Sequence, residues 1–305
     1  MIFPRPALRI CVLLGLTLAS CSAPGALPFA GASTRLVSPA GNSWDDAETA
    51  RWALEHEVVF LGELHDSDPG HRRLESLFSE LIEQAAAERR TLTLSLEMFE
   101  RDVQDVLDDY LLGRISEEQL LEEARAWPNY AQHYRPLVEL CRANQLDVIA
   151  ANIPRRVARQ VSKEGLSAVR SSLYAPRTVH ADQGEYRDRM AALMLGSSHG
   201  DGDAQSAHGG PELSDSFLRL FQAQAIKDDA MAESIARFLD EPRARAEGRA
   251  LVVHLCGRFH SDYHLGTVER LSWRRPRLSI GTLSMVDESE ARGEDRPADV
   301  LLVLP

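Results

Sequence analysis

Apolar positions along the chain gather into six short runs, separated by longer stretches with helical spacing. Runs of this length, rich in β-branched residues and bounded by turn residues, are typical of strands buried on both faces. We predict strands at Val58–Leu61, Thr91–Leu96, Asp147–Ala151, Ala250–Leu255, Leu278–Thr282 and Val300–Leu304. Strands that alternate with helices indicate parallel pairing through crossover connections.

The stretches between these runs carry helix signals. Apolar residues three and four apart predict helices over about 45–54, 71–89, 154–162 and 214–239. Residues 100–146 read as wholly helical, with a capping box at Ser116 and Gln119 and Pro136 in a first helical turn. The predicted fold class is α/β: a central, largely parallel sheet flanked by helices over residues 44–305, with a helical insertion at about 100–146.

Residues 1–20 read as a lipoprotein signal peptide. Arg5 and Arg9 flank the start of an apolar stretch, Ile10–Leu18, that is too short to span a membrane. The sequence Leu18-Ala19-Ser20-Cys21 resembles the bacterial lipoprotein cleavage box, so Cys21 is the expected lipidation site and membrane anchor. An ordinary secretory signal with an incidental cysteine is the alternative. Residues 21–43, rich in Ala, Gly, Pro and Ser, are expected to form a flexible tether.

Charge and cysteine content narrow the function classes. The formal net charge is −12, and no Lys/Arg cluster with interleaved aromatic residues occurs, so nucleic-acid binding is not expected. Beyond the signal region the chain contains Cys141 and Cys256, both in apolar contexts. We expect two buried free thiols; a disulfide between them is the alternative in an oxidising compartment.

A four-residue pattern, G-x-x-H, occurs twice, each time directly after a predicted strand. The first copy contains Glu63 and His65, and the second ends in His260. A third strand ends in Glu97. Because open α/β sheets place their ligand sites at the carboxyl ends of strands, we expect these four side chains to share one pocket.

This set of residues allows three interpretations. Two histidines and two carboxylates could hold a divalent metal ion such as Zn²⁺, Mn²⁺ or Fe²⁺ and activate water. Without a metal, a glutamate and a histidine could act as a general base and its partner, with Arg155 balancing the paired carboxylates. The third interpretation is a buried hydrogen-bonded cluster that only positions the loops.

Other polar residues have simpler expected roles. We predict that His254 is a core histidine and that Asp228 and Asp229 lie on a solvated helix face. His199 and His208 fall in a Gly-, Ser- and Asp-rich stretch that reads as a solvated loop, with transient metal binding as the alternative.

The order of the motifs resembles the ChaN family of bacterial haem-binding lipoproteins. The resemblance covers most of residues 44–285 and rests on these segments in sequence: Gly62–Asp66, Leu96–Glu100, Trp127–Tyr134, Asn152–Arg156, Gln222–Gln224, Met231–Ile235 and Gly257–His260. It implies a fold shared with Tiki-type metalloproteases, TraB-like proteins and erythromycin esterases. It also implies a lipoprotein of the bacterial outer membrane that binds haem for iron uptake or storage, often as a homodimer, and that works with an outer-membrane haem receptor.

In this family a tyrosine supported by a histidine holds the haem iron. The segment Trp127–Pro136 offers Tyr130, His133 and Tyr134, and Tyr263 is a further candidate. Core packing with a satisfied hydroxyl is the alternative for the first two tyrosines. Tyr174 and Tyr186 are further candidates for the haem ligand. His180 lies with Tyr186 in a region that could cover a site. The relatives with esterase or protease activity leave a second function open, a metal-assisted or Glu/His-assisted hydrolase.

Overall fold

The computed structural model describes residues 33–181, 184–196, 214–245 and 250–305. The chain divides into two units, Met1–Ala32 and Ser33–Pro305, and only the second is described. The predicted signal peptide, Cys21, His199 and His208 lie outside the described residues. Among the helices that the structure describes, none combines the length and the apolar character needed to cross a membrane.

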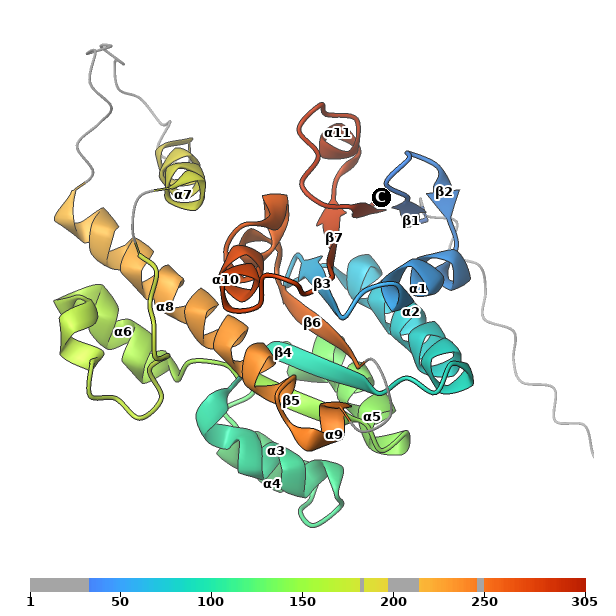
Figure 1. Cartoon of the computed structure of the whole chain (residues 1–305), viewed down its shortest axis with the longest axis horizontal. Coiled ribbons are helices and arrows are strands. Elements are labelled where there is room, and N and C mark those ends of the chain that lie inside the picture. Colours follow the sequence, from blue (N-terminus) through green and yellow to red (C-terminus); the bar gives the residue numbers. More distant parts are fainter. Residues whose placement is uncertain (1–32, 182–183, 197–213, 246–249) are drawn as a thin grey trace, which may run out of the picture. The chain divides into compact units, whose positions relative to one another are not determined.

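One mixed sheet forms the centre of the second unit (Figure 1). Its strands within the described residues follow the order β2-β1-β8-β7-β3-β6-β4-β5. They are β1 (Arg35–Val37), β2 (Ser43–Trp44), β3 (Val58–Glu63), β4 (Leu92–Glu100), β5 (Asp147–Asn152), β6 (Leu251–Gly257), β7 (Ile280–Val286) and β8 (Val300–Val303). Neighbours from β8 to β5 pair in parallel, and β1 and β2 add an antiparallel edge. The predicted α/β fold with a largely parallel sheet is confirmed.

Helices form at the predicted places, and further helices that were not predicted lie between later strands. They are α1 (Asp46–Leu54), α2 (Asp68–Ala87), α3 (Gln104–Leu111), α4 (Glu117–Glu123), α5 (Arg135–Ala143), α6 (Arg155–Glu164), α7 (Glu185–Gly196), α8 (Asp215–Phe238), α9 (Pro242–Arg245), α10 (Thr267–Arg274) and α11 (Glu288–Ala291). Short turns of helix add η1 (Arg101–Val103), η2 (Tyr130–Tyr134), η3 (Leu166–Val169), η4 (Arg258–His260) and η5 (Asp262–His264). The segment between β4 and β5 is helical as predicted, and the capping box of Ser116 and Gln119 is formed.

Helices cover both faces of the sheet, because successive residues of a strand point to opposite sides. On one face Leu61 shares an apolar core with residues of α1, α2 and α5. On the other face Phe60 packs with residues of α8 and α10. Cys141 belongs to the first core and Cys256 to the second, and both are buried free thiols. The alternative of a disulfide between them is therefore wrong.

The fold begins earlier than predicted. Arg35–Val37 pairs with β8, and Ser43–Trp44 pairs with Arg35–Val37 in turn. Leu36 is completely buried in the main core. The predicted tether at 21–43 is thus wrong for residues 35–43, whose partner strand lies at the far end of the chain, where local composition carries no information about the pairing.

We expect a chain that begins at Trp44 to be markedly less stable than one that begins at Ser33. The shorter chain loses Leu36 and Val37, and burial of each such side chain contributes about 1.5–3 kcal/mol. Urea unfolding of both proteins measures the difference. Equal free energies of unfolding would show that residues 33–43 act as a tether after all.

Candidate functional site

The two G-x-x-H motifs lie side by side at the carboxyl edge of the sheet. β3 and β6 are parallel neighbours, and their register places Glu63 opposite Gly257. β4, which carries Glu97, pairs with β6 on its other side. The structure therefore brings Glu63, His65, Glu97 and His260 to one place, through strand pairing between distant parts of the chain.

Each motif needs its glycine because the other motif lies against it. A Cβ atom at Gly62 would lie only 2.7 Å from Ser261 Oγ and 3.1 Å from Arg258 Cα. A Cβ atom at Gly257 would lie 3.0 Å from two ring atoms of His65. Any larger residue at either position would push the two motifs apart.

Glu63 is a buried carboxylate surrounded by donors. Its Oε1 accepts hydrogen bonds from His65 Nδ1 at 2.9 Å and from the Tyr134 hydroxyl at 2.7 Å. His71 Nε2 of α2 lies 2.7 Å from Oε2. Burial raises the pKa of Glu63, but these three neighbours outweigh it and hold the pKa below its usual value. Glu63 is therefore ionised at neutral pH.

His65 is the accessible member of the pair. Its side chain is 44% exposed and packs edge-on against Trp127, with ring centroids 4.9 Å apart. The hydrogen bond to Glu63 is the main cause that raises the pKa of His65. Since Nδ1 is held by Glu63, Nε2 remains for proton exchange with a bound molecule, which is the arrangement of a general acid or base.

His260 is clamped between two buried carboxylates. Its Nδ1 lies 2.7 Å from Asp228 Oδ1, and its Nε2 lies 3.4 Å from Glu97 Oε1. The second oxygen of Glu97 accepts a hydrogen bond from the Gly257 N–H at 2.8 Å. Asp228 also accepts hydrogen bonds from the hydroxyls of Thr267 and Tyr186. Both carboxylates that contact His260 therefore also accept hydrogen bonds from other groups.

Charge compensation makes His260 an imidazolium. Burial lowers the pKa of His260, but the charges of Glu97 and Asp228 outweigh it and raise the pKa to about 10. In return, His260 holds the pKa of both carboxyls below their usual values against the effect of burial. Two acids and one cation share the site, so the burial of each is compensated.

The structure does not support the interpretation of these four side chains as a divalent-metal site. Within the described residues, no group of three or more His, Cys, Asp or Glu side chains is placed to hold a metal ion. Both nitrogens of His260 face carboxylates, Asp228 at 2.7 Å and Glu97 at 3.4 Å, so a metal ion at this ring would have to displace these contacts. Arg155, predicted to balance the carboxylates, is exposed at the start of α6 and lines a separate cavity.

The haem candidates between the helices of the insertion are buried. Tyr130 is 2% exposed and Tyr134 is 1% exposed, with the Tyr134 hydroxyl bound to Glu63. His133 stacks on His71 with ring centroids 4.2 Å apart and bonds to Asp68. Burial raises the pKa of both phenols further above their usual value. This segment holds the first motif in place and offers no exposed phenol.

Tyr263 has a different setting. It lines a cavity of about 680 Å³ together with apolar side chains and two arginines. The cavity is formed by Tyr186, Arg189, Ala192, Leu193, Arg258, Phe259, Asp262, Tyr263, Leu265 and Glu290. The guanidinium of Arg189 lies over the Tyr263 ring, 3.4 Å from its centroid. Tyr263 and His264 both adopt positive φ values, 60° and 57°, which are uncommon for residues with a side chain and recur at functional sites.

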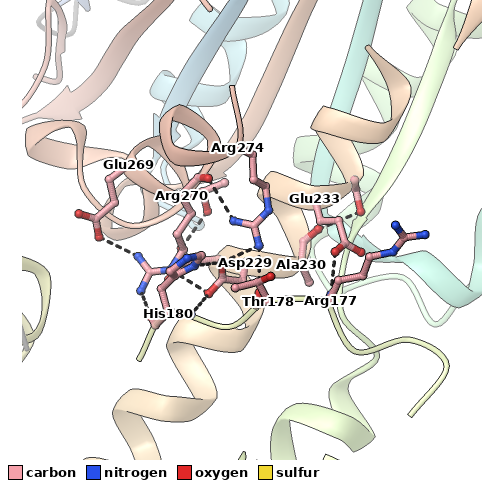
Figure 2. Close-up of polar contacts among 12 residues, drawn as sticks. Arg177, Thr178, His180, Asp229, Ala230, Glu233, Glu269, Arg270 and Arg274 are labelled. Carbon is pink, nitrogen blue, oxygen red and sulfur yellow. Dashed lines mark hydrogen bonds and ion pairs between the residues drawn. The ribbon is translucent and has the colours of Figure 1, made fainter. Parts of the chain in front are cut away.

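Asp228 and Asp229 contradict the predicted solvated helix face, because both are completely buried. Asp228 holds His260, as described above. Asp229 accepts hydrogen bonds from the backbone and the ring of His180 and pairs with Arg270 and Arg274, as Figure 2 shows. The sequence did contain a signal: alanine and other apolar residues surround this pair on α8, which indicates a helix buried on most sides.

Two smaller predictions can be compared with the structure. His254 is a core histidine, as predicted: it is fully buried, bonds to Ser95 and packs edge-on against Phe60. Burial lowers its pKa to about 4, so it is neutral. Tyr174, the remaining tyrosine candidate, lies under the guanidinium of Arg156.

Comparison with known proteins identifies relatives of this chain. Residues 50–271 match a family model described as haem-binding uptake, Tiki superfamily, ChaN. A solved structure of ChaN of Campylobacter jejuni with cofacial haem binding superposes with a TM-score of 0.66 at 15% identity, over 88% of this chain and 96% of that one. Protein RETICULATA-RELATED 5 of Arabidopsis thaliana, a chloroplastic protein, is 27% identical over 257 residues. That match covers 81% of this chain but only 34% of the plant protein, so this chain spans about a third of it.

We expect both nitrogens of His260 to be protonated at pH 8, which ¹⁵N NMR of the imidazole reports directly. The pKa of about 10 lies above the usual 6.5, so the imidazolium stabilises the fold fully below pH 6.5. This contribution is lost as the pH rises toward 10, by at most about 1.4 kcal/mol per pH unit. In His260→Gln, the free energy of unfolding should decline less between pH 7 and pH 10. A neutral His260 at pH 8 would contradict the ion cluster.

Proposed function

Since the chain belongs to the ChaN family of haem-binding uptake proteins in the Tiki superfamily, we propose that it binds haem in the cavity beside Tyr263. The observation that supports this placement is a partly exposed tyrosine in an apolar cavity with arginines at its wall. A volume of about 680 Å³ lies in the range of small-molecule and cofactor sites.

The chemistry of the cavity fits a porphyrin. The rings of Tyr186 and Phe259, with centroids 4.9 Å apart, and the aliphatic side chain of Leu265 provide apolar surface. Leu193 at the wall is 58% exposed, so apolar surface extends out of the cavity. Haem, when bound, supplies an iron that accepts a phenolate ligand.

Tyr263 is the side chain that would hold the iron. Burial raises the pKa of its phenol, and nearby Asp295 raises it further, whereas Arg189 acts in the opposite direction. Arg189 is therefore positioned to stabilise the phenolate that ligation requires. Tyr130 and Tyr134 would have to leave the core to reach an iron, and Glu63 would lose a donor.

We further propose that the protein acts in iron uptake or storage as a lipoprotein of the bacterial outer membrane, anchored through Cys21. The cleavage-box pattern at Leu18–Cys21 supports the anchor, and the family's description supports the uptake role. We also propose a homodimer and an outer-membrane haem receptor as partners. These two partners rest on the resemblance to the ChaN family.

A hemin titration of Ser22–Pro305, followed by absorbance, tests haem binding. We expect a saturable Soret shift with a phenolate charge-transfer band. In Tyr263→Phe that band should disappear, because the phenol oxygen is the only part removed. Tyr174→Phe is the matched control, since Tyr174 lies outside the cavity. An unchanged spectrum in Tyr263→Phe would show that another residue is the axial ligand of the iron. Absence of a Soret shift in the parent protein would contradict the haem proposal.

A second candidate function is hydrolysis at the G-x-x-H cluster. The accessible His65, bonded to the ionised Glu63, supports it as an acid–base pair. Glu63 would orient the ring, and Nε2 of His65 would move a proton to or from a bound ester or amide. This acid–base role requires only the contact between Glu63 and His65, which the structure contains.

We expect any hydrolytic activity to fall by about 10²–10⁴-fold in His65→Ala, the usual contribution of a general acid or base. The same variant should keep the hemin spectrum of the parent. Activity would be screened with ester and amide substrates, with and without a chelator. If the variant folds and binds hemin but neither protein hydrolyses any substrate, the hydrolase proposal is without support.

A further inference from the structure

A basic cavity lies beside α6, and it shares no lining residue with the cavity of Tyr263. It has a volume of about 570 Å³. It is lined by Glu100, Arg125, Arg155, Arg156, Arg159, Gln160, Lys163 and Glu164. Five of these eight side chains are cationic, in a chain whose formal net charge is −12.

The amphipathic character of α6 explains how these cations are presented. Val157, Ala158 and Val161 are buried in a core shared with α8. Arg155, Arg159 and Lys163 recur every four residues on the opposite side and are exposed. At a rise of 1.5 Å per residue, this row covers about 12 Å along the helix.

Glu100 and Asp102 at the edge of the cavity are paired with arginines, whereas Glu164 in its lining accepts a hydrogen bond from Gln160. Arg125 pairs with Glu100 at 2.9 Å and with Asp102 at 2.5 Å. Arg156 pairs with the other oxygen of Asp102 at 2.6 Å. Across the described residues, by contrast, no ion pair reaches Arg155, Arg159 or Lys163. Like charges on neighbouring helical turns repel one another, and a bound anion would relieve this repulsion.

We propose that this cavity binds a ligand with phosphate groups. Guanidinium groups match the geometry of phosphate oxygens through paired hydrogen bonds, and a lysine adds a compact charge. A phosphate monoester carries close to two negative charges at neutral pH, whereas a carboxylate carries one. A row of three unpaired cations over about 12 Å therefore suits a ligand with two or more phosphate groups. A free phosphorylated compound and the headgroups of an anionic membrane share this chemistry.

Lys163 allows a direct test, because the chain contains only one other lysine, Lys227. Amine labelling of Ser22–Pro305, read by mass spectrometry, would report the occupancy of the cavity. Inorganic pyrophosphate is the free probe, and vesicles of phosphatidylglycerol are the membrane probe. We expect at least one probe to protect Lys163 and to leave Lys227 unchanged. Sodium chloride at matched ionic strength should protect neither.

Arg159→Gln/Lys163→Gln should weaken binding of the effective probe by about tenfold or more, measured by calorimetry or vesicle sedimentation. Arg72→Gln/Arg277→Gln, which removes the same charge at exposed positions outside the cavity, is the matched control and should bind like the parent. Protection by pyrophosphate alone identifies a free ligand, and protection by vesicles alone identifies a membrane surface; both support the proposal.

Three outcomes would overturn it. One is no binding of either probe, and another is equal weakening in both double variants, which indicates a diffuse charge effect. The third is protection of Lys163 by hemin but not by either phosphate probe, which would assign the cations to haem propionates. The hemin spectrum is measured separately at Tyr263, so failure here leaves the haem proposal untouched.

Discussion

Burial of negative charge at the carboxyl edge of the sheet constrains much of this structure. Glu63, Glu97 and Asp228 lie where water does not reach them, and an unpaired buried carboxylate is strongly destabilising. Their donors come from the loop after β3 and from α2, η2, β6, η4, α7 and α10, which are far apart in the sequence. Satisfying these three groups therefore holds together the strand ends and the helices around them.

The same cluster supports the cavity proposed for haem. Tyr186 donates its hydroxyl to Asp228, while its ring lines the cavity. The loop after β6 directs His260 into the ion cluster and, three residues later, places Tyr263 at the cavity. The G-x-x-H residues can thus be important for haem binding without touching haem, which brings the structural and the functional interpretations of the motif together.

The local sequence pattern was sufficient to predict most strands and one helix cap. The six apolar runs became β3–β8, and Ser116 with Gln119 formed its capping box, because such features depend only on neighbouring residues. Prediction failed where the partner is remote. β1 needs β8, and the buried state of Asp228 and Asp229 needs His260, His180 and Arg270, none of which is near in sequence. A polar residue on a helix is indistinguishable from a solvated one until its partner is known.

The sequence by itself determined the α/β class, the placement of two G-x-x-H motifs at strand ends and the resemblance to a haem-binding family. These follow from periodicity and motif order, which are properties of the linear chain. Only the tertiary structure decided which chemistry those residues can carry. Two carboxylates enclose His260 and raise its pKa to about 10, and the core covers Tyr130 and Tyr134 but leaves Tyr263 beside a cavity. Protonation state and accessibility depend on neighbours that folding brings together, which is why the sequence left both open.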